Sequence, residues 1–325
     1  MKKTIALFLI LNILTVACNL STSTTPDHPA PGPGAGSPEP VASSTQEPGP
    51  AAVPPLAELV PADTENAYWV TNPTSNARLY TRAFYPADWN GSDLLPALVL
   101  MPGGIGKSDP QRAARLSGEG FIVIVFDADG RGQSEGTEDY NGFITQDGLT
   151  AVIAAAAKLP GLDTSRYGLV SFSYGVTAAA GALSRYPDLP IDFYIDWEGP
   201  VDRFYTTVYC GSDPHTDIPW QPCTDDAWWS EREAVHFIGA LDVPYQRLQS
   251  EEDHVQPNNN HAIDIVNAAV AGGVPWVRLN DYPPNQMYDV NNPPAMIPEA
   301  QDKHLEQIVI RYAEEIINNV LPTLP

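Results

Sequence analysis

The sequence predicts an α/β fold in which helices cover both faces of a mostly parallel sheet. Two observations carry this prediction. Short and almost wholly apolar runs, such as "ALVLM" at 97–101 and "FIVIVF" at 121–126, are typical of strands buried on both faces. Alanine-rich helical segments that stop at proline or glycine separate the later apolar runs. Strands that alternate with helices favour parallel pairing, because the helix carries the chain back across the sheet.

The first 17 residues predict a signal peptide. Lys2 and Lys3 precede an apolar run that ends at Ala17, and this run is shorter than the about 20 residues a membrane span needs. The stretch "LTVAC" resembles a bacterial lipobox, which implies lipid attachment at Cys18 and a place in the cell envelope. Thr15 departs from the usual leucine of that motif, so plain secretion remains an alternative.

A polar stalk is expected over 18–62. Eleven of the 33 prolines lie in this segment, mixed with serine, threonine, glycine and alanine. Such a composition buries too little apolar surface to offset the entropy of ordering the chain. The remaining residues, 63–325, are enough for one large α/β domain.

Eight strands are expected in that domain, and the first two look antiparallel. Their ranges are 67–71, 79–85, 97–101, 121–126, 167–171, 191–197, 243–249 and 274–279. Helices are expected at 146–159, 174–186, 260–271 and 301–320, the last with apolar residues at three-to-four spacing along one face. A small insert separates the sixth and seventh strands. Its aromatic side chains either line a substrate pocket or pack the insert itself: Tyr205, Tyr209, Trp220, Trp228 and Trp229.

Charge and cysteine content exclude several classes of protein. The net charge of −23 argues against nucleic-acid binding, which needs lysine and arginine against phosphates. The "GGIGKS" segment lacks the spacing of a nucleotide-binding phosphate loop. If Cys18 carries lipid, Cys210 and Cys223 form an even pair, and a disulfide is expected in an oxidising compartment. Zinc would need further ligands, and only His215 lies between the two cysteines.

The pentapeptide "SFSYG" lies where the fifth strand meets the next helix. A tight turn there would project the Ser173 side chain above the sheet, while the small residues Ser171 and Gly175 let strand and helix pass closely. The N–H of Tyr174, at the helix start, would point to where an oxyanion forms. The pentapeptide alone favours a helix N-cap over a nucleophile, since serine is a preferred N-cap residue.

The neighbouring loops favour a catalytic site. "LPALVLMPGGIG" runs from a strand into glycines, so that Gly104 could supply a second oxyanion N–H. "FIVIVFDADGRGQSEG" follows the next strand. With these segments the chain resembles the α/β-hydrolase superfamily over roughly 80–320. "GRGQSEG" and "SFSYG" resemble the X-prolyl dipeptidyl-peptidase and cocaine-esterase group, and "GGIG" resembles dienelactone-hydrolase-type and acetyl-xylan-type esterases.

The resemblance implies a nucleophile, an acid and a histidine in that chain order. Asp253, in "LQSEEDHVQP" after the seventh strand, aligns with the acid, and Asp196 after the sixth strand is the main alternative. His304 is the one histidine that follows the last strand, where the superfamily places its base. The loop before it is longer than usual. The other domain histidines, His215, His236, His254 and His261, precede the last strand.

The resemblance therefore implies a serine hydrolase that needs no metal or organic cofactor. Ser173 would attack a carboxylic ester and form an acyl-enzyme, with His304 as base and Asp253 as acid. A peptidase that acts on short peptides is the alternative enzyme. A surface binding protein without catalysis, built on the same frame, is the alternative of another class. Membrane contact is expected only through the N-terminal lipid.

Overall fold

A computed structural model describes residues 57–207, 210, 221–256, 258–298 and 302–323. The predicted signal peptide, Cys18 and most of the stalk lie outside these residues. Residues 57–62, which the sequence predicts as part of the stalk, belong to the fold. The short strand β1 (Val60–Pro61) pairs with β2, and the Lys158 ammonium donates a hydrogen bond to the Ala57 carbonyl. The sheet therefore starts before the predicted boundary at 63.

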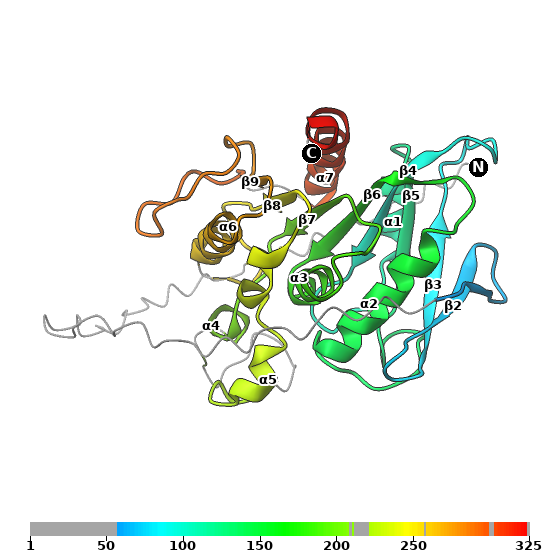
Figure 1. Ribbon diagram of the computed structural model, residues 1–325, viewed down its shortest axis with the longest axis horizontal. Coiled ribbons are helices and arrows are strands. Elements are labelled where there is room, and N and C mark those ends of the chain that lie inside the picture. The colour runs from blue at the N-terminus through cyan, green and yellow to red at the C-terminus, as the bar shows by residue number, and fades with distance from the viewer. Residues whose placement is uncertain (1–56, 208–209, 211–220, 257, 299–301, 324–325) are drawn as a thin grey trace, which may run out of the picture. The chain divides into compact units, whose positions relative to one another are not determined.

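All eight expected strands are present, and with β1 they form one nine-stranded sheet. Its order is β1-β2-β3-β5-β4-β6-β7-β8-β9. Figure 1 shows β2 and β3 toward one end and β8 and β9 toward the other. The bounds are Ala67–Thr71 for β2, Arg78–Phe84 for β3, Leu95–Met101 for β4, Ile122–Phe126 for β5, Leu162–Phe172 for β6, Phe193–Trp197 for β7, Tyr245–Leu248 for β8 and Val277–Leu279 for β9.

Pairing in the sheet changes direction at β5. The pairs from β1 through β3 to β5 are antiparallel, and every pair from β5 onward is parallel. The strands β4 and β5 are buried along nearly their whole length, as their apolar sequences predict. The carboxyl ends of the parallel strands therefore meet at one edge of the sheet.

Helices cover the two faces of this sheet. One apolar cluster packs α2 (Phe143–Ala156), α3 (Gly175–Arg185) and α6 (Asn260–Gly272) against one face. A second cluster packs α1 (Pro110–Ser117) and α7 (Asp302–Glu315) against the other. The sequence predicted four of these helices within a few residues. It missed α1, which begins at the N-cap Asp109 with proline as its first residue.

The insert after β7 carries two short helices and a disulfide. These helices are α4 (Arg203–Thr206) and α5 (Asp226–Ser230), and two 3₁₀ turns, η1 (Ala234–His236) and η2 (Ile238–Ala240), lead on to β8. Cys210 and Cys223 are bonded, which confirms the expected pairing. The Thr207 hydroxyl accepts the Cys210 N–H at 2.8 Å, so the disulfide is tied to the end of α4.

After α7, the described residues form a π turn, η3 (Ile316–Val320), and a 3₁₀ turn, η4 (Leu321–Thr323). Within the described part of the chain, no helix has both the length and the apolar character needed to cross a membrane.

Candidate active site

Three neighbouring strands deliver the polar side chains of the site. Ser173 directly follows β6, Glu198 directly follows β7, and the segment 250–254 follows β8. The sheet hydrogen bonds continue one step past the strand ends, because the Ser173 N–H donates to the Trp197 carbonyl at 2.9 Å and the Glu198 N–H donates to the Leu248 carbonyl at 3.0 Å. The backbone positions of Ser173 and Glu198 are therefore fixed by the sheet itself.

Ser173 occupies a strained turn between β6 and α3. Its φ of 49° lies in the left-handed region, which costs a residue with a side chain of order 1 kcal/mol. The turn is tight because α3 starts against β4: a Cβ at Gly175 would lie 2.6 Å from the Pro102 carbonyl oxygen, and one at Gly103 would lie 2.8 Å from the Ser173 Cβ. Strain of this kind concentrates at functional sites, and here it lifts the serine hydroxyl out of the sheet.

Ser171 has a different role from Ser173. Its side chain is fully buried, and its hydroxyl lies 2.6 Å from the Tyr194 hydroxyl. It fills the position of the first glycine in the expected turn while its polar atom is satisfied inside the sheet. The nucleophile candidate is therefore the second serine of "SFSYG".

The histidine beside Ser173 is His254. Its Nε2 lies 2.9 Å from the Ser173 Oγ, and its Nδ1 lies 3.1 Å from a carboxylate oxygen of Glu198. In the tautomer that satisfies both contacts, Nδ1–H donates to Glu198 and Nε2 accepts the serine proton. This is the arrangement of a nucleophile, a base and an orienting carboxylate.

Glu198 is held in place from both sides. Its side chain is 5% exposed, and its second oxygen accepts the Ser250 N–H at 3.0 Å and the Ser250 hydroxyl. Glu198 itself has a φ of 53°, which turns its side chain toward the site immediately after β7. A buried carboxylate with this many donors is preorganised to orient an imidazole.

Asp253, the predicted acid, also faces His254 but from farther away. Its Oδ1 lies 3.6 Å from the His254 Nδ1 and accepts the N–H groups of Val255 and Gln256 at 2.9 and 2.8 Å. Its Oδ2 lies 3.1 Å from the Nε2 of the buried His261. Asp253 therefore holds the loop that carries His254 and adds a second negative charge to the site.

These charges shift the pKa values of the site. Burial alone would lower the pKa of His254, but the hydrogen bond that its imidazole donates to Glu198 and the negative charges of Asp253 and Glu198 outweigh burial, so this pKa is raised. Burial alone would raise the pKa of Asp253, but His261 and the two backbone N–H groups hold it well below its usual value. Asp253 is thus ionised at neutral pH, and His254 is a stronger base than a free histidine.

The prediction that His304 is the base is wrong. His304 lies in the first turn of α7 with an exposed side chain, while His254 occupies the position beside Ser173. The physical reason is the packing of α7. Leu305, Ile308 and Val309 bury that helix in the cluster on the α1 face of the sheet, and Glu306 pairs with Arg112 and Arg115 of α1. The long loop before α7 carries His304 to that face.

The alternative acid, Asp196, belongs to the core. It is fully buried in β7, where its carboxylate pairs with Arg247 and accepts the Tyr245 hydroxyl at 3.1 Å. It lies one residue before the strand end, so its side chain stays inside the sheet layer. Two residues later, Glu198 reaches the site that Asp196 was considered for.

The two predicted oxyanion residues lie at the site. Gly104, with a φ of 56°, and Tyr174 line the same pocket as Ser173 and His254. The turn that carries Ser173 and Tyr174 is held by side-chain hydrogen bonds. The buried Asn141 amide donates to the Tyr174 carbonyl at 2.8 Å, and its oxygen accepts a hydrogen bond from Arg131. Asp127 ties the glycine loop to the "GRGQSEG" turn by accepting the N–H groups of Ser108 and Gln133 at 2.8 and 2.9 Å.

The pocket in front of Ser173 is small, with a volume of about 50 Å³. Its walls come from the glycine loop that contains Gly104, the turn at Ser173 and Tyr174, the loop after β7, α4 and the loop after β8. The lining residues are Gly104, Ser173, Tyr174, Glu198, Pro200, Thr206, Asp253, His254, Val255 and Gln256. Acidic groups dominate the charged part of this lining.

Glu198, Asp253 and His254 also have the ligand types of a small metal site. One ligand atom of each lies within 4.8 Å of the others. The same atoms already make the hydrogen bonds that orient His254 toward Ser173, so a bound cation would replace that arrangement. The donor set fits the serine–histidine pair better than it fits an ion.

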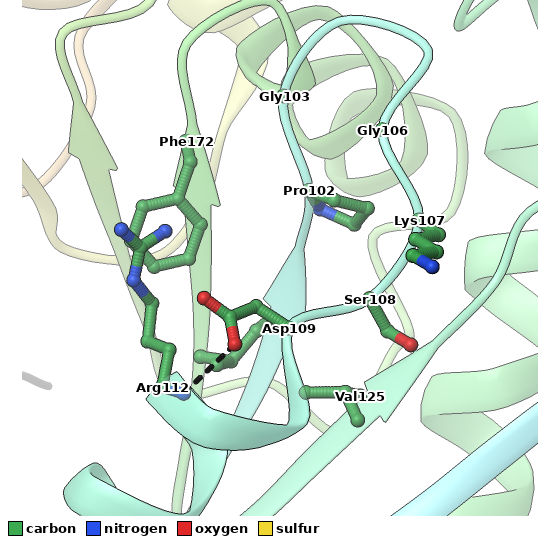
Figure 2. A pocket seen from close by; sticks show the side chains of 10 residues that line it. Pro102, Gly103, Gly106, Lys107, Ser108, Asp109, Arg112, Val125 and Phe172 are labelled. Atoms are coloured by element: carbon green, nitrogen blue, oxygen red, sulfur yellow. Dashed lines mark hydrogen bonds between the residues drawn. The ribbon is translucent and has the colours of Figure 1, made fainter. Parts of the chain in front are cut away.

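A second and larger pocket, of about 130 Å³, lies behind the glycine loop. Figure 2 shows Arg112 over the Phe172 ring and Asp109 bonded to the backbone of the first turn of α1. Ser173 does not line this pocket. Because Asp109 already accepts the N–H groups of Gln111 and Arg112, this helix start is capped by its own side chain.

Two residues of the candidate site are not predicted from the sequence. His254 directly follows Asp253 in "EEDHV" and precedes the last strand, and Glu198 follows the "IDW" strand end by one residue. Both signals were present: Glu198 is the first carboxylate after β7, which neighbours β6, and His254 is the first histidine after β8, which neighbours β7. Sheet adjacency, more than chain order, identifies them.

Comparisons with known proteins identify the fold. No protein-family model and no curated protein sequence matches the chain. Solved structures do match. Est1E from Butyrivibrio proteoclasticus, with ferulic acid bound, has a TM-score of 0.56 at 17% identity over 77% of this chain and 98% of its own. Acetyl xylan esterase 1 from Thermoanaerobacterium sp. has a TM-score of 0.54 at 11% identity, over 80% of this chain and 87% of its own.

Peptidases match as well. Dipeptidyl peptidase 4 of Porphyromonas gingivalis has a TM-score of 0.56 at 18% identity over 77% of this chain, but the chain spans only 35% of its length. The mixed sheet, the strained serine turn after β6 and these structural neighbours agree. The chain has the α/β-hydrolase fold.

Proposed function

We propose that the protein is a serine hydrolase that cleaves carboxylic esters. One observation carries the proposal: the Ser173 Oγ lies 2.9 Å from the His254 Nε2, and the opposite nitrogen of that imidazole faces the buried Glu198 at 3.1 Å. Within this proposal Ser173 is the nucleophile, His254 the general base and Glu198 the acid that orients it. Asp253 is a second carboxylate that steadies the loop and the imidazolium.

The reaction would run in two halves. His254 takes the Ser173 proton as Oγ attacks the ester carbonyl, and the N–H groups of Gly104 and Tyr174 face the oxyanion of the tetrahedral intermediate. The intermediate collapses, the C–O bond to the alcohol breaks, and His254 gives its proton to the departing alcohol. Water then attacks the acyl-enzyme by the same steps in reverse, which releases the acid and restores Ser173.

The pocket and the comparisons support an ester over a peptide. The pocket that the described residues form in front of Ser173 is small, about 50 Å³. The fold spans nearly all of the two esterases above, whereas the peptidases contain long regions that this chain does not match. A peptidase remains the second candidate, favoured by the likeness to dipeptidyl peptidases.

A substrate panel tests the proposal. Wild type and Ser173→Ala are assayed on p-nitrophenyl acetate and butyrate beside alanyl-proline and glycyl-proline p-nitroanilides. We expect ester turnover above anilide turnover, and a loss of roughly 10⁴-fold or more in Ser173→Ala because the nucleophile is gone. Ser171→Ala is the matched control and should lose far less. Anilide turnover far above ester turnover would replace the ester by a peptide.

A binding protein without catalysis would give a third result. In that case the purified chain would turn over neither substrate class, and Ser173→Ala would behave as the wild type does. The intact serine, histidine and carboxylate contacts argue against this outcome, because a chain without catalysis has no need to keep a strained serine turn.

We also propose that the chain is exported and held at the cell envelope by lipid on Cys18. The disulfide between Cys210 and Cys223 supports an oxidising compartment. Expression of wild type and Cys18→Ala in a bacterial host, followed by detergent partition, tests the anchor. The wild type should enter the detergent phase and Cys18→Ala should not; equal partition of both would contradict lipid attachment.

A further inference from the structure

Two residues on the wall of the Ser173 pocket carry buried polar atoms without a hydrogen-bond partner. They are the Thr206 Oγ1 and the Gln256 Oε1. Thr206 is 9% exposed and Gln256 is 7% exposed, so both side chains are largely buried. Buried polar groups in folded proteins are nearly always paired, because an unpaired one costs free energy. Two such atoms on one small pocket call for a partner that binds there.

Both side chains are placed by contacts that do not involve these atoms. Thr206 ends α4, where its N–H donates to the Asp202 carbonyl, and the next residue is tied to the disulfide loop. The Gln256 N–H donates to the Asp253 Oδ1 at 2.8 Å. The backbone of each residue is therefore fixed while its polar side-chain atom stays unused, which is what a preformed recognition site requires.

The chemistry of the two atoms limits the partner. The Gln256 Oε1 can only accept a hydrogen bond, whereas the Thr206 hydroxyl can donate or accept. A substrate carbonyl would satisfy Thr206 but leave the Gln256 oxygen unpaired. A hydrocarbon group would leave both unpaired. A hydroxyl donates and accepts, so it can satisfy either atom.

The size of the pocket limits the partner further. A volume of about 50 Å³ has room for roughly three water-sized groups. A short substituent with a single hydroxyl matches that space more closely than a bulky acyl group does.

We propose that Thr206 and Gln256 are specificity-determining residues that select short esters carrying a hydroxyl near the scissile bond. The hydroxyl can come from the acid, as in a 2-hydroxyacyl group, or from the alcohol, as in a glycol or glycerol ester. The inference rests on the proposed function, since it assigns the substrate class of the Ser173 site. A site built to hydrogen-bond a hydroxyl discriminates strongly against the analogue that lacks it.

Matched ester pairs test this. Ethyl lactate, as each enantiomer, is compared with ethyl propanoate, and 2-hydroxyethyl propanoate is compared with propyl propanoate, by acid release in a pH-stat. For each pair the ratio of kcat/KM values, hydroxylated over plain, is measured in wild type, Thr206→Val and Gln256→Leu. The ratio is independent of how much enzyme is folded, and the intrinsic reactivity of the esters cancels between wild type and variant.

We expect the ratio of at least one pair to fall about 10-fold or more in both variants, because each loses one hydrogen-bonding group of the site. The pair that responds tells whether the hydroxyl belongs to the acid or the alcohol. Thr150→Val is the matched control, since its hydroxyl bonds to the Gln146 carbonyl within α2, and its ratios should stay within about twofold of wild type.

Ratios that stay within twofold in both variants, with plain esters still cleaved in a Ser173-dependent way, would overturn the inference and leave the proposed function intact. If the wild type cleaves none of the four esters, the ester function falls, and the inference falls with it.

Discussion

At the scale of single residues, the site depends on two carboxylates that face one imidazole. Glu198 lies closer to the His254 Nδ1 than Asp253 does, at 3.1 against 3.6 Å, and only Glu198 uses that oxygen for the histidine alone. The Asp253 oxygen that lies nearer to His254 also accepts two backbone N–H groups. The geometry therefore suits Glu198 to orient the imidazole and Asp253 to hold the loop that carries it.

Glu198→Gln and Asp253→Asn separate these two roles. The base must be neutral to accept the Ser173 proton, so activity falls as the pH drops through the His254 pKa. Glu198 raises that pKa. Removing its charge should move the acid limb of the kcat/KM profile to lower pH while the rate falls by roughly 10³–10⁴-fold, the size of effect seen when a triad acid becomes an amide.

Asp253→Asn should shift the same limb less and cost less activity, because the charge it removes lies farther from the imidazole. The pH profiles of both variants on one ester check this. A larger loss in Asp253→Asn than in Glu198→Gln would make Asp253 the orienting acid, as its place in the sequence first indicated.

At the scale of elements, the sequence predicted the strands well and the loops poorly. The middle runs, such as 97–101 and 121–126, are short and almost wholly apolar, which is typical of strands buried on both faces. Ser173 could be predicted because the turn "SFSYG" occurs together with the glycine segment "PGGIG" and the segment "GRGQSEG", each of which follows an apolar strand. His254 and Glu198 could not, because their meeting depends on which strands are neighbours and on how far each loop reaches, and neither is written in a local pattern. The sequence also does not show which face of the sheet α7 covers. That packing places His304 on the α1 face of the sheet, where His254 and not His304 lies beside Ser173.

The insert gives a prediction at this scale. The disulfide between Cys210 and Cys223, thirteen residues apart, closes a short loop next to α4. Replacing both cysteines by serine should lower the free energy of unfolding by about 2–4 kcal/mol, since the unfolded chain regains the entropy of the open loop. Chemical denaturation measures the change.

Reductant serves as the control for that prediction. It should destabilise the wild type by a similar amount and leave the serine variant unaffected. Two free thiols in the oxidised wild type, found by mass spectrometry, would contradict the bond itself.

At the scale of the whole molecule, a buried ion pair joins the two strands behind the site. Arg247 in β8 and Asp196 in β7 are both fully buried and paired with each other, and Arg247 also donates to the Gly199 carbonyl at 2.9 Å and the Gln249 amide oxygen at 2.6 Å. This network fixes β7 against β8, and with them the spacing between Glu198 and His254.

Arg247→Met should therefore lower the free energy of unfolding by about 3–5 kcal/mol, because it leaves the Asp196 charge buried without a partner. The double variant Asp196→Asn with Arg247→Met should be more stable than Arg247→Met alone, since the uncompensated charge is gone. Urea unfolding compares the three proteins. A loss below about 1 kcal/mol in Arg247→Met would mean that the pair does not hold the strands.

The central claim is that His254, reached through sheet adjacency, is the base that activates Ser173. The rate at which a fluorophosphonate probe modifies Ser173 tests it most directly, measured in wild type, His254→Ala and His304→Ala with the labelled peptide mapped. We predict that wild type and His304→Ala are labelled at Ser173 at rates within about twofold, whereas His254→Ala is slower by roughly 10³-fold or more, as loss of a triad base requires. Normal labelling of His254→Ala together with a collapse in His304→Ala, or no labelling of Ser173 in the wild type, would contradict the claim.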